Sequence, residues 1–303
     1  MTGKIGLVGL GLVGTAIAER LLAKRFEVVG FDIDLAKCKH LEKLGGKAVS
    51  GPANLAQEVE RVVLSLPDTK IVLQVVEDAG GILDSGTFPR VPARRGPKYI
   101  IDTTTGDPEE ITALAQRLAE RGIYFLDATI SGSSQQVRER DAVFMVGGDK
   151  AAFETCTDIF EALSEKVFYL GPSGSGSKAK LASNLILGLN RLALAEGLVF
   201  ASKLGLNPKV FLELLKDTPA YSVVMATKGK KMLNGDFAPQ ARIRQHYKDV
   251  SLILKYARKA GQELPLSRVH VDILEKSIAA GDGELDNSAI IRQIKRQNKL
   301  SSS

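Results

Sequence analysis

The stretch Gly171-Pro-Ser-Gly-Ser-Gly-Ser-Lys-Ala-Lys-Leu-Ala-Ser-Asn184 leads into a long apolar run that ends near Leu204. Its glycines stop before Ser177, and from there to Lys203 only Gly188 and Gly197 interrupt a helical pattern. We therefore predict one long helix of about 25 residues, roughly 38 Å long at 1.5 Å per residue. Apolar side chains lie on nearly every side of it, which is typical of a helix buried between layers.

Lys180 and Asn184 are four residues apart in this helix, so both project from one face near its glycine-rich end. The pattern alone leaves two readings of the lysine open. It could extend along the protein surface until its ammonium group reaches water, as lysines commonly do. It could instead be a functional amine. The other motifs of the chain favour the second reading.

Length and composition indicate a soluble protein of two domains. The chain has 303 residues, of which 44% are hydrophobic and 25% are charged. Its net charge is +6, from 41 basic and 35 acidic residues. The basic clusters lack interleaved aromatic residues, so we read them as solvated faces and expect no nucleic-acid partner. The two cysteines, Cys38 and Cys156, give neither a disulfide framework nor a metal-binding spacing. We expect a cytoplasmic protein with no metal site.

The N-terminal segment imitates a signal peptide, because Lys4 precedes an apolar run that ends at Ala16-Ile17-Ala18. Four glycines interrupt that run, and its removal would delete the first strand of the motif described next. We therefore expect no signal peptide. We also expect no membrane partner, since no other apolar stretch reaches about 18 residues without polar interruption.

A glycine-rich motif follows the first predicted strand, Lys4 to Val8. It reads Gly9-Leu10-Gly11-Leu12-Val13-Gly14, opens a helix to about Ala23, and is followed by a strand from Glu27 to Phe31 and then Asp32. This context is typical of a dinucleotide site. Gly9 allows the tight turn, Gly11 lets a pyrophosphate approach the backbone, and Gly14 lets helix and strand pack closely. Asp32 would accept the ribose hydroxyls of NAD and repel the additional phosphate of NADP.

Further strands alternate with helices, which predicts a largely parallel sheet with helices on both faces. The predicted strands are Arg61 to Leu66, Lys98 to Asp102, Ile123 to Ala128, Ala142 to Gly147 and Lys166 to Tyr169. Leu66-Pro67 and Asp102-Thr103-Thr104-Thr105 lie at carboxyl ends of strands, where such sheets bind ligands. The segment from Asp84 to Pro97, with three prolines, reads as an exposed loop to which we assign no function.

The chain beyond the long helix shows helical patterns and no convincing strand. Asn207-Pro208 reads as a helix cap and the first helical residue. Helical patterns then cover Lys209 to Lys216, Val223 to Leu233, Tyr247 to Ala260, Ser267 to Ala279 and Asn287 to Gln297. We predict an α/β Rossmann domain over residues 1–172, followed by an all-α substrate and dimerisation domain over residues 173–303. The long buried helix joins the two.

A second polar motif, Asp127-Ala128-Thr129-Ile130-Ser131-Gly132-Ser133, follows another predicted strand. Its Ser-Gly-Ser turn presents hydroxyls and unobstructed backbone N–H groups, which suit a carboxylate. Alone, such a turn would more often be an ordinary loop.

Together these motifs resemble the β-hydroxyacid dehydrogenase family. Gly9 to Gly14 is similar to the family's cofactor loop, and Asp127 to Gly132 to its substrate motif. Gly174-Ser175-Gly176 with Lys180 and Asn184 matches the family's catalytic motif, and Lys248-Asp249 its late Lys-Asp pair. The four motifs occur in the family's order and spacing. The resemblance implies a Rossmann domain, a long connecting helix, a helical domain, and a homodimer or homotetramer.

The resemblance also implies roles for individual residues. Lys180 becomes the catalytic acid/base and Asn184 a substrate hydrogen-bonding residue. Ser131 and Gly132 would hold the substrate carboxylate, and Ser133 belongs to the same substrate-binding motif. Thr105 and Lys248 would line the cofactor site, with Leu66 and Pro67 against it. The implied reaction moves a hydride between a small β-hydroxy acid and NAD. Burial and a neighbouring cationic nicotinamide would both favour the neutral lysine that takes the hydroxyl proton.

The chain departs from the family pattern mainly around the substrate motif. Thr129 replaces the usual proline, Ser133 the second glycine, and Ser183 the first of two asparagines, while Arg140 replaces a glycine. These changes concern the substrate more than the reaction. A glyoxylate, tartronate-semialdehyde or succinic-semialdehyde reductase is the alternative. The run Phe237-Ala238-Pro239, Arg242 and His246-Tyr247-Lys248-Asp249 resembles that subgroup. Imine reductases usually lack the lysine, and a non-catalytic nucleotide-binding scaffold would not need it.

Overall fold

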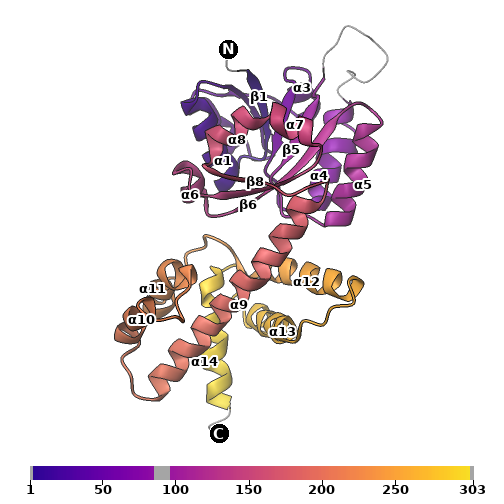
Figure 1. Ribbon diagram of the computed structural model, residues 1–303. Coiled ribbons are helices and arrows are strands. Elements are labelled where there is room, and N and C mark those ends of the chain that lie inside the picture. The colour runs from indigo at the N-terminus through magenta and orange to yellow at the C-terminus, as the bar shows by residue number, and fades with distance from the viewer. Residues whose placement is uncertain (1–2, 85–95, 301–303) are drawn as a thin grey trace. The chain divides into compact units, whose positions relative to one another are not determined.

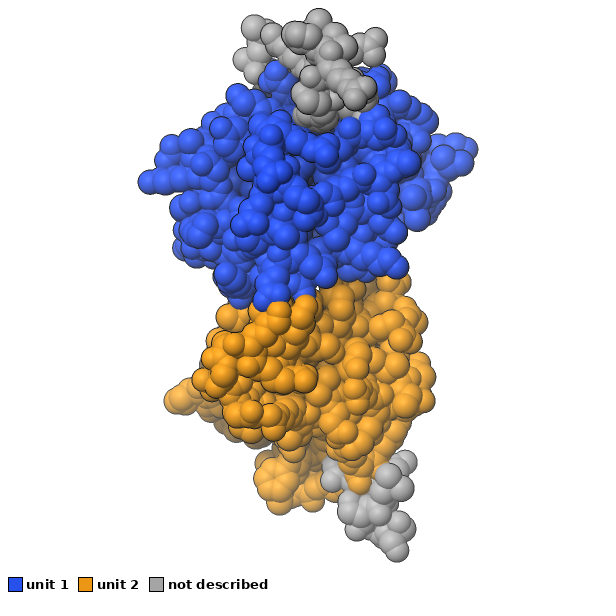
Figure 2. Space-filling model, turned by 90° about the vertical axis from the view of Figure 1, so that its right-hand side faces the viewer, with its two compact units in different colours: residues 1–180 blue, residues 181–303 orange. Residues whose placement is uncertain are grey.

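The structure is a computed structural model that describes residues 3–84 and 96–300, with side chains described as far as Gln297. The chain divides into two compact units, residues 1–180 and residues 181–303 (Figure 2). Residues 85–95, the centre of the predicted exposed loop, lie outside the described residues.

The first unit is built on an eight-stranded sheet with the strand order β3-β2-β1-β4-β5-β6-β7-β8. All neighbouring strands are parallel except β6 and β7, which are antiparallel. This confirms the predicted largely parallel sheet. The strands are β1 (Lys4–Val8), β2 (Glu27–Phe31), β3 (Lys47–Ala48), β4 (Arg61–Leu64), β5 (Tyr99–Asp102), β6 (Tyr124–Ser131), β7 (Val143–Gly147) and β8 (Lys166–Tyr169).

Helices cover both faces of this sheet, as Figure 1 shows for α1 and α8 on one side and α4 and α5 on the other. Successive side chains of a strand point to opposite faces, so each strand supplies apolar residues to two cores. Ile5 and Leu7 of β1 lie in one core and Val8 lies in the other. The helices are α1 (Leu12–Ala23), α2 (Leu35–Lys43), α3 (Pro52–Ala56), α4 (Thr69–Glu77), α5 (Pro108–Ala119), α6 (Ser134–Arg138), α7 (Lys150–Thr155) and α8 (Thr157–Leu163), with a 3₁₀ turn η1 (Ile82–Asp84).

Three local predictions need correction. The predicted strand from Arg61 to Leu66 ends at Leu64. The strand predicted to end at Ala128 continues to Ser131, so most of the second polar motif lies in β6 itself rather than in a turn after it. The cause is β7, which pairs antiparallel with β6 from Asp127 to Ser131 and supplies the hydrogen bonds that keep this segment extended. The short strand β3 was not predicted, because two residues are too few to show the alternation of apolar and polar side chains that indicates a strand.

The long helix is confirmed as α9 (Ser175–Lys203), which begins two residues before the predicted start. Its residues Leu192, Leu194, Leu198 and Val199 belong to the core of the helical unit. Its burial is one-sided in the single chain, however, because Ile186 is 61% exposed and Phe200 is 63% exposed.

The second unit is helical throughout its described residues, as predicted. It contains α10 (Pro208–Lys216), α11 (Lys230–Asn234), α12 (Ile243–Lys259), α13 (Pro265–Ala279), α14 (Ile290–Leu300), a π-helical turn η2 (Met225–Gly229) and a 3₁₀ turn η3 (Asn287–Ala289). Asn207 caps α10 by accepting hydrogen bonds from the N–H groups of Lys209 and Val210, which confirms the predicted cap. The predicted helix from Val223 to Leu233 is helical throughout, but its residues from Met225 to Gly229 form the π-helical turn η2, which continues directly into α11.

By length and composition, α9 could also cross a membrane, and it is the one helix in the described part of the chain that could. The core helix of a soluble protein meets the same criteria. Its contribution to the core of the helical unit accounts for its apolar composition without a bilayer.

Candidate active site

The glycine loop has the geometry that its sequence predicts. Gly9 adopts a φ of 91°, and a Cβ there would collide with the carbonyl oxygen of Ser65. A Cβ on Gly14 would collide with the carbonyl oxygen of Gly9, so α1 packs directly on the loop. At Gly11, by contrast, a Cβ would meet nothing within 4 Å. The loop therefore has open space at the position where a pyrophosphate would approach the backbone.

Asp32 lies at the end of β2 and is only 8% exposed. Its carboxylate accepts hydrogen bonds from the N–H groups of Leu10, at 2.7 Å, and Asp34, at 2.9 Å. The ammonium group of Lys37 lies 3.3 Å from the same carboxylate. Asp32 thus fastens the glycine loop to β2 in addition to any contact with a ribose. Sequence reasoning missed Lys37, which stands five residues on, in the first turn of α2.

The predicted cofactor residues Leu66 and Pro67 follow strand β4, and Thr105 follows strand β5. Leu66 is partly buried, and its N–H donates to the hydroxyl of Thr104 at 3.2 Å. Its side chain would also contact a Cβ on Gly9, at 3.2 Å. Leu66 therefore lies against the glycine loop. Pro67 is exposed and Thr105 is partly buried, so both are reachable from this edge of the sheet.

Ser131 and Gly132 lie at the end of β6. Ser131 is partly buried, whereas Gly132 is exposed and adopts a φ of 151° that favours glycine. The predicted substrate residue Ser133 has an additional role, because it caps α6. Its hydroxyl accepts from the N–H of Gln136, at 3.2 Å, and its own N–H donates to the Gln136 side chain, at 3.0 Å. Both polar groups of Ser133 are therefore used within the protein.

Lys180 is 8% exposed and Asn184 is 5% exposed, so both polar side chains are buried on α9. The amide nitrogen of Asn184 donates to Oδ2 of Asp249 on α12 at 3.0 Å. The other carboxylate oxygen of Asp249 lies 3.5 Å from the ammonium group of Lys248. The structure thus joins Asn184 to the late Lys-Asp pair in one cluster. This hydrogen bond to Asp249 uses one N–H of the Asn184 amide and fixes the amide's orientation.

Two histidines extend this cluster along α9. A Cβ on Gly188 would lie 2.6 Å from Nε2 of His246 and 2.7 Å from Cε1 of His270, so only glycine fits beneath the two rings. The ring centroids are 5.0 Å apart. Burial and the nearby Arg191 lower the pKa of His270 to about 4, and burial lowers the pKa of Arg191 to about 10. Gly188, one of two glycines in the predicted helix, is therefore explained by close packing.

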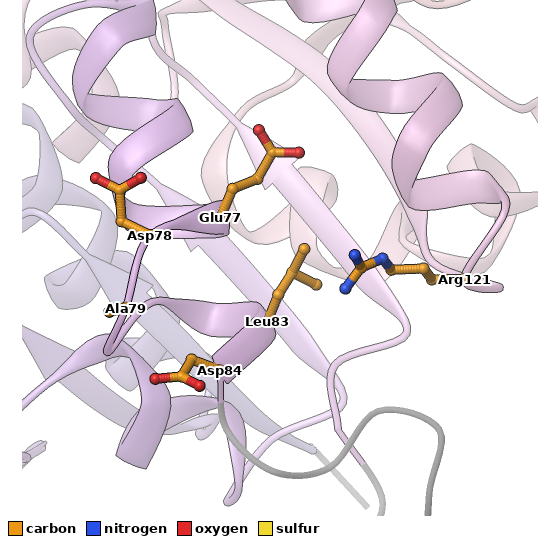
Figure 3. A pocket seen from close by; sticks show the side chains of 6 residues that line it. All are labelled: Glu77, Asp78, Ala79, Leu83, Asp84 and Arg121. Carbon is orange, nitrogen blue, oxygen red and sulfur yellow. The ribbon is translucent and has the colours of Figure 1, made fainter.

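A separate hollow of about 200 Å³ lies away from these residues. Figure 3 shows it between Leu83 and Asp84 of η1, Arg121 after α5, and Glu77, Asp78 and Ala79 at the end of α4. Because α4 runs away from the carboxyl end of β4, its last turn lies at the opposite edge of the sheet from Leu66. Parallel sheets bind nucleotides at the carboxyl edge, so we do not assign a cofactor to this hollow.

The arrangement of the first unit fits a dinucleotide. The first N–H groups of α1 have no partner inside the helix, as at any helix N-terminus, and they follow a loop with free space at Gly11. An acidic side chain stands at the end of β2, and polar residues follow β4 and β5. The described residues contain no group of three or more metal-ligating side chains.

Comparisons with known proteins agree with this geometry. The family profile described as the NAD binding domain of 6-phosphogluconate dehydrogenase matches residues 4–171. The profile described as NAD-binding of NADP-dependent 3-hydroxyisobutyrate dehydrogenase matches residues 174–294. Glyoxylate/succinic semialdehyde reductase 1 of Arabidopsis thaliana is 30% identical over 96% of this chain and 98% of its own length. The 2-hydroxy-3-oxopropionate reductase of Escherichia coli is 30% identical over 96% of this chain and 97% of its own.

A solved structure extends the agreement to the fold. The crystal structure of 3-hydroxyisobutyrate dehydrogenase from Salmonella typhimurium superposes with a TM-score of 0.86 at 23% identity, covering 95% of this chain and 99% of that one. Two profiles over nearly the whole chain, relatives of full length and the shared fold lead to one conclusion: the chain belongs to the β-hydroxyacid dehydrogenase family.

Proposed function

We propose that this oxidoreductase interconverts a small β-hydroxy acid and its semialdehyde or keto acid, with Lys180 as the general acid/base. The observation that carries the proposal is the buried Lys180, one helical turn before Asn184 on α9. Burial of a lysine is costly unless the ammonium group is paired or the amine is neutral, so such residues are uncommon outside functional sites.

The remaining roles follow from the chemistry of the groups. A bound nicotinamide dinucleotide supplies the hydride acceptor or donor. In the oxidative direction, the neutral amine of Lys180 accepts the proton of the substrate hydroxyl at Nζ. Asn184, oriented by Asp249, hydrogen-bonds the substrate. The hydroxyl of Ser131 and the N–H of Gly132 donate to the substrate carboxylate. Charge-assisted bonds of this kind contribute about 1.5–3 kcal/mol each.

One specific observation favours reduction of a semialdehyde as the physiological direction of the reaction. Of three relatives that are 30% identical over nearly their whole length, two are named reductases, glyoxylate/succinic semialdehyde reductase 1 and 2-hydroxy-3-oxopropionate reductase, and one is named 2-(hydroxymethyl)glutarate dehydrogenase. The segment from Phe237 to Asp249, which resembles that subgroup, includes the Asp249 that orients Asn184. A screen of hydroxy acids and semialdehydes in both directions identifies the substrate.

We further propose that NAD is preferred over NADP. The support is Asp32, whose carboxylate lies at the end of β2, where it would repel a 2′-phosphate. Lys37 reduces this repulsion, because its ammonium group is 3.3 Å from Asp32. The same cofactor site is proposed to be lined by Thr105, Lys248, Leu66 and Pro67.

We also propose a cytoplasmic homodimer or homotetramer, in which residues 173–303 supply the substrate and dimerisation surfaces. The support is the exposed apolar side of the helical unit, where Phe200 and Leu204 are more than 60% exposed. Burial of such a surface against a second copy removes apolar area from water.

Replacement of Lys180 tests the proposed function. General acid–base catalysis contributes about 10²–10⁴-fold, so Lys180→Ala should lower kcat at least about 100-fold. The affinity for NADH should change little, because the glycine loop and Asp32 are untouched. Lys180→Arg should not restore activity, since arginine keeps its proton near neutral pH. The assays are run with NAD and NADP, and we expect the higher kcat/KM with NAD.

Lys178 provides the matched control. It is exposed and lies two residues away on the same helix, on a different face. Lys178→Ala should therefore leave kcat unchanged. A kcat for Lys180→Ala within tenfold of the parent, in a folded protein that binds NADH, would contradict the catalytic role.

A further inference from the structure

The polar face of β6 meets the first turn of α9, the helix that carries Lys180. Asp127, Thr129 and Ser131 alternate along β6 and so share one face of the strand. Ala128 and Ile130 point to the other face, into the apolar core. Strand β5 ends opposite Asp127, so the rest of β6 pairs with β7 alone.

Asp127 holds the start of α9 through its carboxylate. One oxygen accepts from the N–H of Gly174 at 2.8 Å, and the other accepts from the N–H of Ser177 at 2.7 Å. These N–H groups belong to the helix start, where no intrahelical acceptor exists. Burial raises the pKa of Asp127, while the two N–H groups oppose that shift. A side chain from β6 therefore caps α9 from outside the helix.

Thr129 adds a second connection one step along the strand. Its hydroxyl donates to the carbonyl oxygen of Gly176 at 2.9 Å, and Thr129 is fully buried. The contact requires close approach, because a Cβ on Gly176 would collide with the carbonyl oxygens of Asp127 and Met145. A Cβ on Gly147 of β7 would lie 2.8 Å from the backbone nitrogen of Ser175. The glycines thus bring the helix start onto the two strands, and the polar groups fix its position there.

We propose that Thr129, together with Asp127, is a positioning residue that fixes the first turn of α9 on β6 and thereby sets Lys180 relative to Ser131. Ser131 is the next residue on the polar face of β6, and Lys180 lies just beyond the fixed turn of α9. Strand β6 therefore sets the positions of both Lys180, which transfers the proton, and Ser131, which binds the substrate carboxylate. The inference rests on the proposed function of Lys180. It also gives a role to Thr129, which stands where the family usually has proline.

The expected consequence is a loss of turnover with little loss of binding. A misplacement of about 1 Å at a reacting group can lower a rate on the order of 100-fold. Thr129→Val keeps the shape of the side chain and removes the hydroxyl. We expect kcat to fall by about 10- to 100-fold. We expect the KM for the substrate and the affinity for NADH to stay within threefold of the parent. Thr129→Ser keeps the hydroxyl and should restore most of kcat.

A double-mutant comparison separates positioning from general destabilisation. If Thr129 acts through Lys180, Thr129→Val should have almost no further effect on the residual kcat of Lys180→Ala. Hydrogen exchange of the amides between residues 173 and 181 gives a readout that does not depend on activity. Thr129→Val should accelerate it.

Ser277→Ala is the matched control. Ser277 is also fully buried, and its hydroxyl also donates to a backbone carbonyl, that of Ile273, at 2.9 Å. Ser277 and Ile273 both belong to α13, so this hydrogen bond does not involve β6. Neither kcat nor the hydrogen exchange of the amides at residues 173–181 should therefore change. Where Thr129→Val fails to fold, Thr129→Ala is measured in its place.

Two results overturn the proposal. One is a kcat for Thr129→Val within twofold of the parent. The other is an equal fold-loss in the parent and in Lys180→Ala, which would show that Thr129 acts independently of the lysine. Failure of the proposed function is distinct, since it appears as near-normal turnover of Lys180→Ala alone.

Discussion

Asp102 is the buried acid at the end of β5. It is 1% exposed, its Oδ1 accepts from the N–H of Thr104 at 3.0 Å, and its Oδ2 has no hydrogen-bond partner among the described residues. Burial raises the pKa of Asp102 to about 7, and the negative charge of Asp127 contributes in the same direction. Asp102 therefore binds a proton in the folded protein over a pH range in which the unfolded chain has released it.

This shift predicts a pH-dependent stability. A carboxyl with a raised pKa stabilises the fold fully below its unfolded value of 3.8, and this contribution is lost as the pH rises through about 7. One pKa unit corresponds to about 1.4 kcal/mol, so the loss is at most about 4 kcal/mol. Asp102→Asn removes the titration. We expect the variant to be more stable than the parent at pH 8, with the difference shrinking towards pH 5, as measured by urea unfolding.

Exposed Asp217 supplies a control with the same change in net charge. Asp217→Asn should shift the urea midpoint by the same small amount at both pH values. A stability difference between Asp102→Asn and the parent that is independent of pH would contradict the assignment.

Single residues also show why part of the site was predictable. At Gly9 and Gly14 a Cβ would collide with backbone carbonyl oxygens, so these two positions require glycine, and their spacing is visible in the sequence. Contacts such as Lys37 with Asp32 depend on side-chain packing and leave no pattern. Arg140 is informative in another way. It adopts a φ of 61°, which explains the family's glycine there, while its guanidinium group bonds Glu165 at 2.9 Å.

At the scale of elements, α6 combines stability with the predicted substrate site, because Ser133 is its cap. Ser133→Ala should destabilise the protein by about 1 kcal/mol, since a helix N-cap is lost. Ser133→Asp keeps a capping oxygen, so the urea midpoint should stay near that of the parent. Its negative charge should nevertheless raise the KM for a carboxylate substrate at least tenfold, if Ser133 faces that carboxylate. An unchanged KM for Ser133→Asp would show that Ser133 caps α6 and does not contact the substrate carboxylate.

The elements that were predicted well are those with strong local signals. The length of α9 follows from a long apolar pattern without proline, and the start of α10 follows from Asn207-Pro208. The end of β6 was wrong because its extended conformation depends on β7, a partner that is distant in sequence. The π-helical turn η2 likewise has no local pattern that separates it from an α-helix. Pairing and packing between distant segments therefore account for the errors.

At the scale of the whole molecule, the helical unit presents an exposed groove of about 920 Å³ between α9, α13 and α14. Phe200 lies in its lining between Glu196 and Lys203, which stand seven residues apart on α9. A second copy of α9 packed antiparallel about Phe200 would oppose each Glu196 with the partner's Lys203. Small residues beside them, Ala193 and Gly197, permit a close approach. This self-complementary pattern suits a twofold dimer, in which one patch meets its own copy.

If the protein forms the proposed twofold dimer, Phe200→Glu should convert it to a monomer. It places two like charges near the twofold axis and removes a large apolar contact, and both changes oppose association. Light scattering at micromolar concentration measures the mass. Phe168→Glu is the matched control, because Phe168 is 54% exposed on β8 of the other unit and should leave the mass unchanged. A dimer that survives Phe200→Glu and dissociates with Phe168→Glu would place the interface on the sheet edge instead.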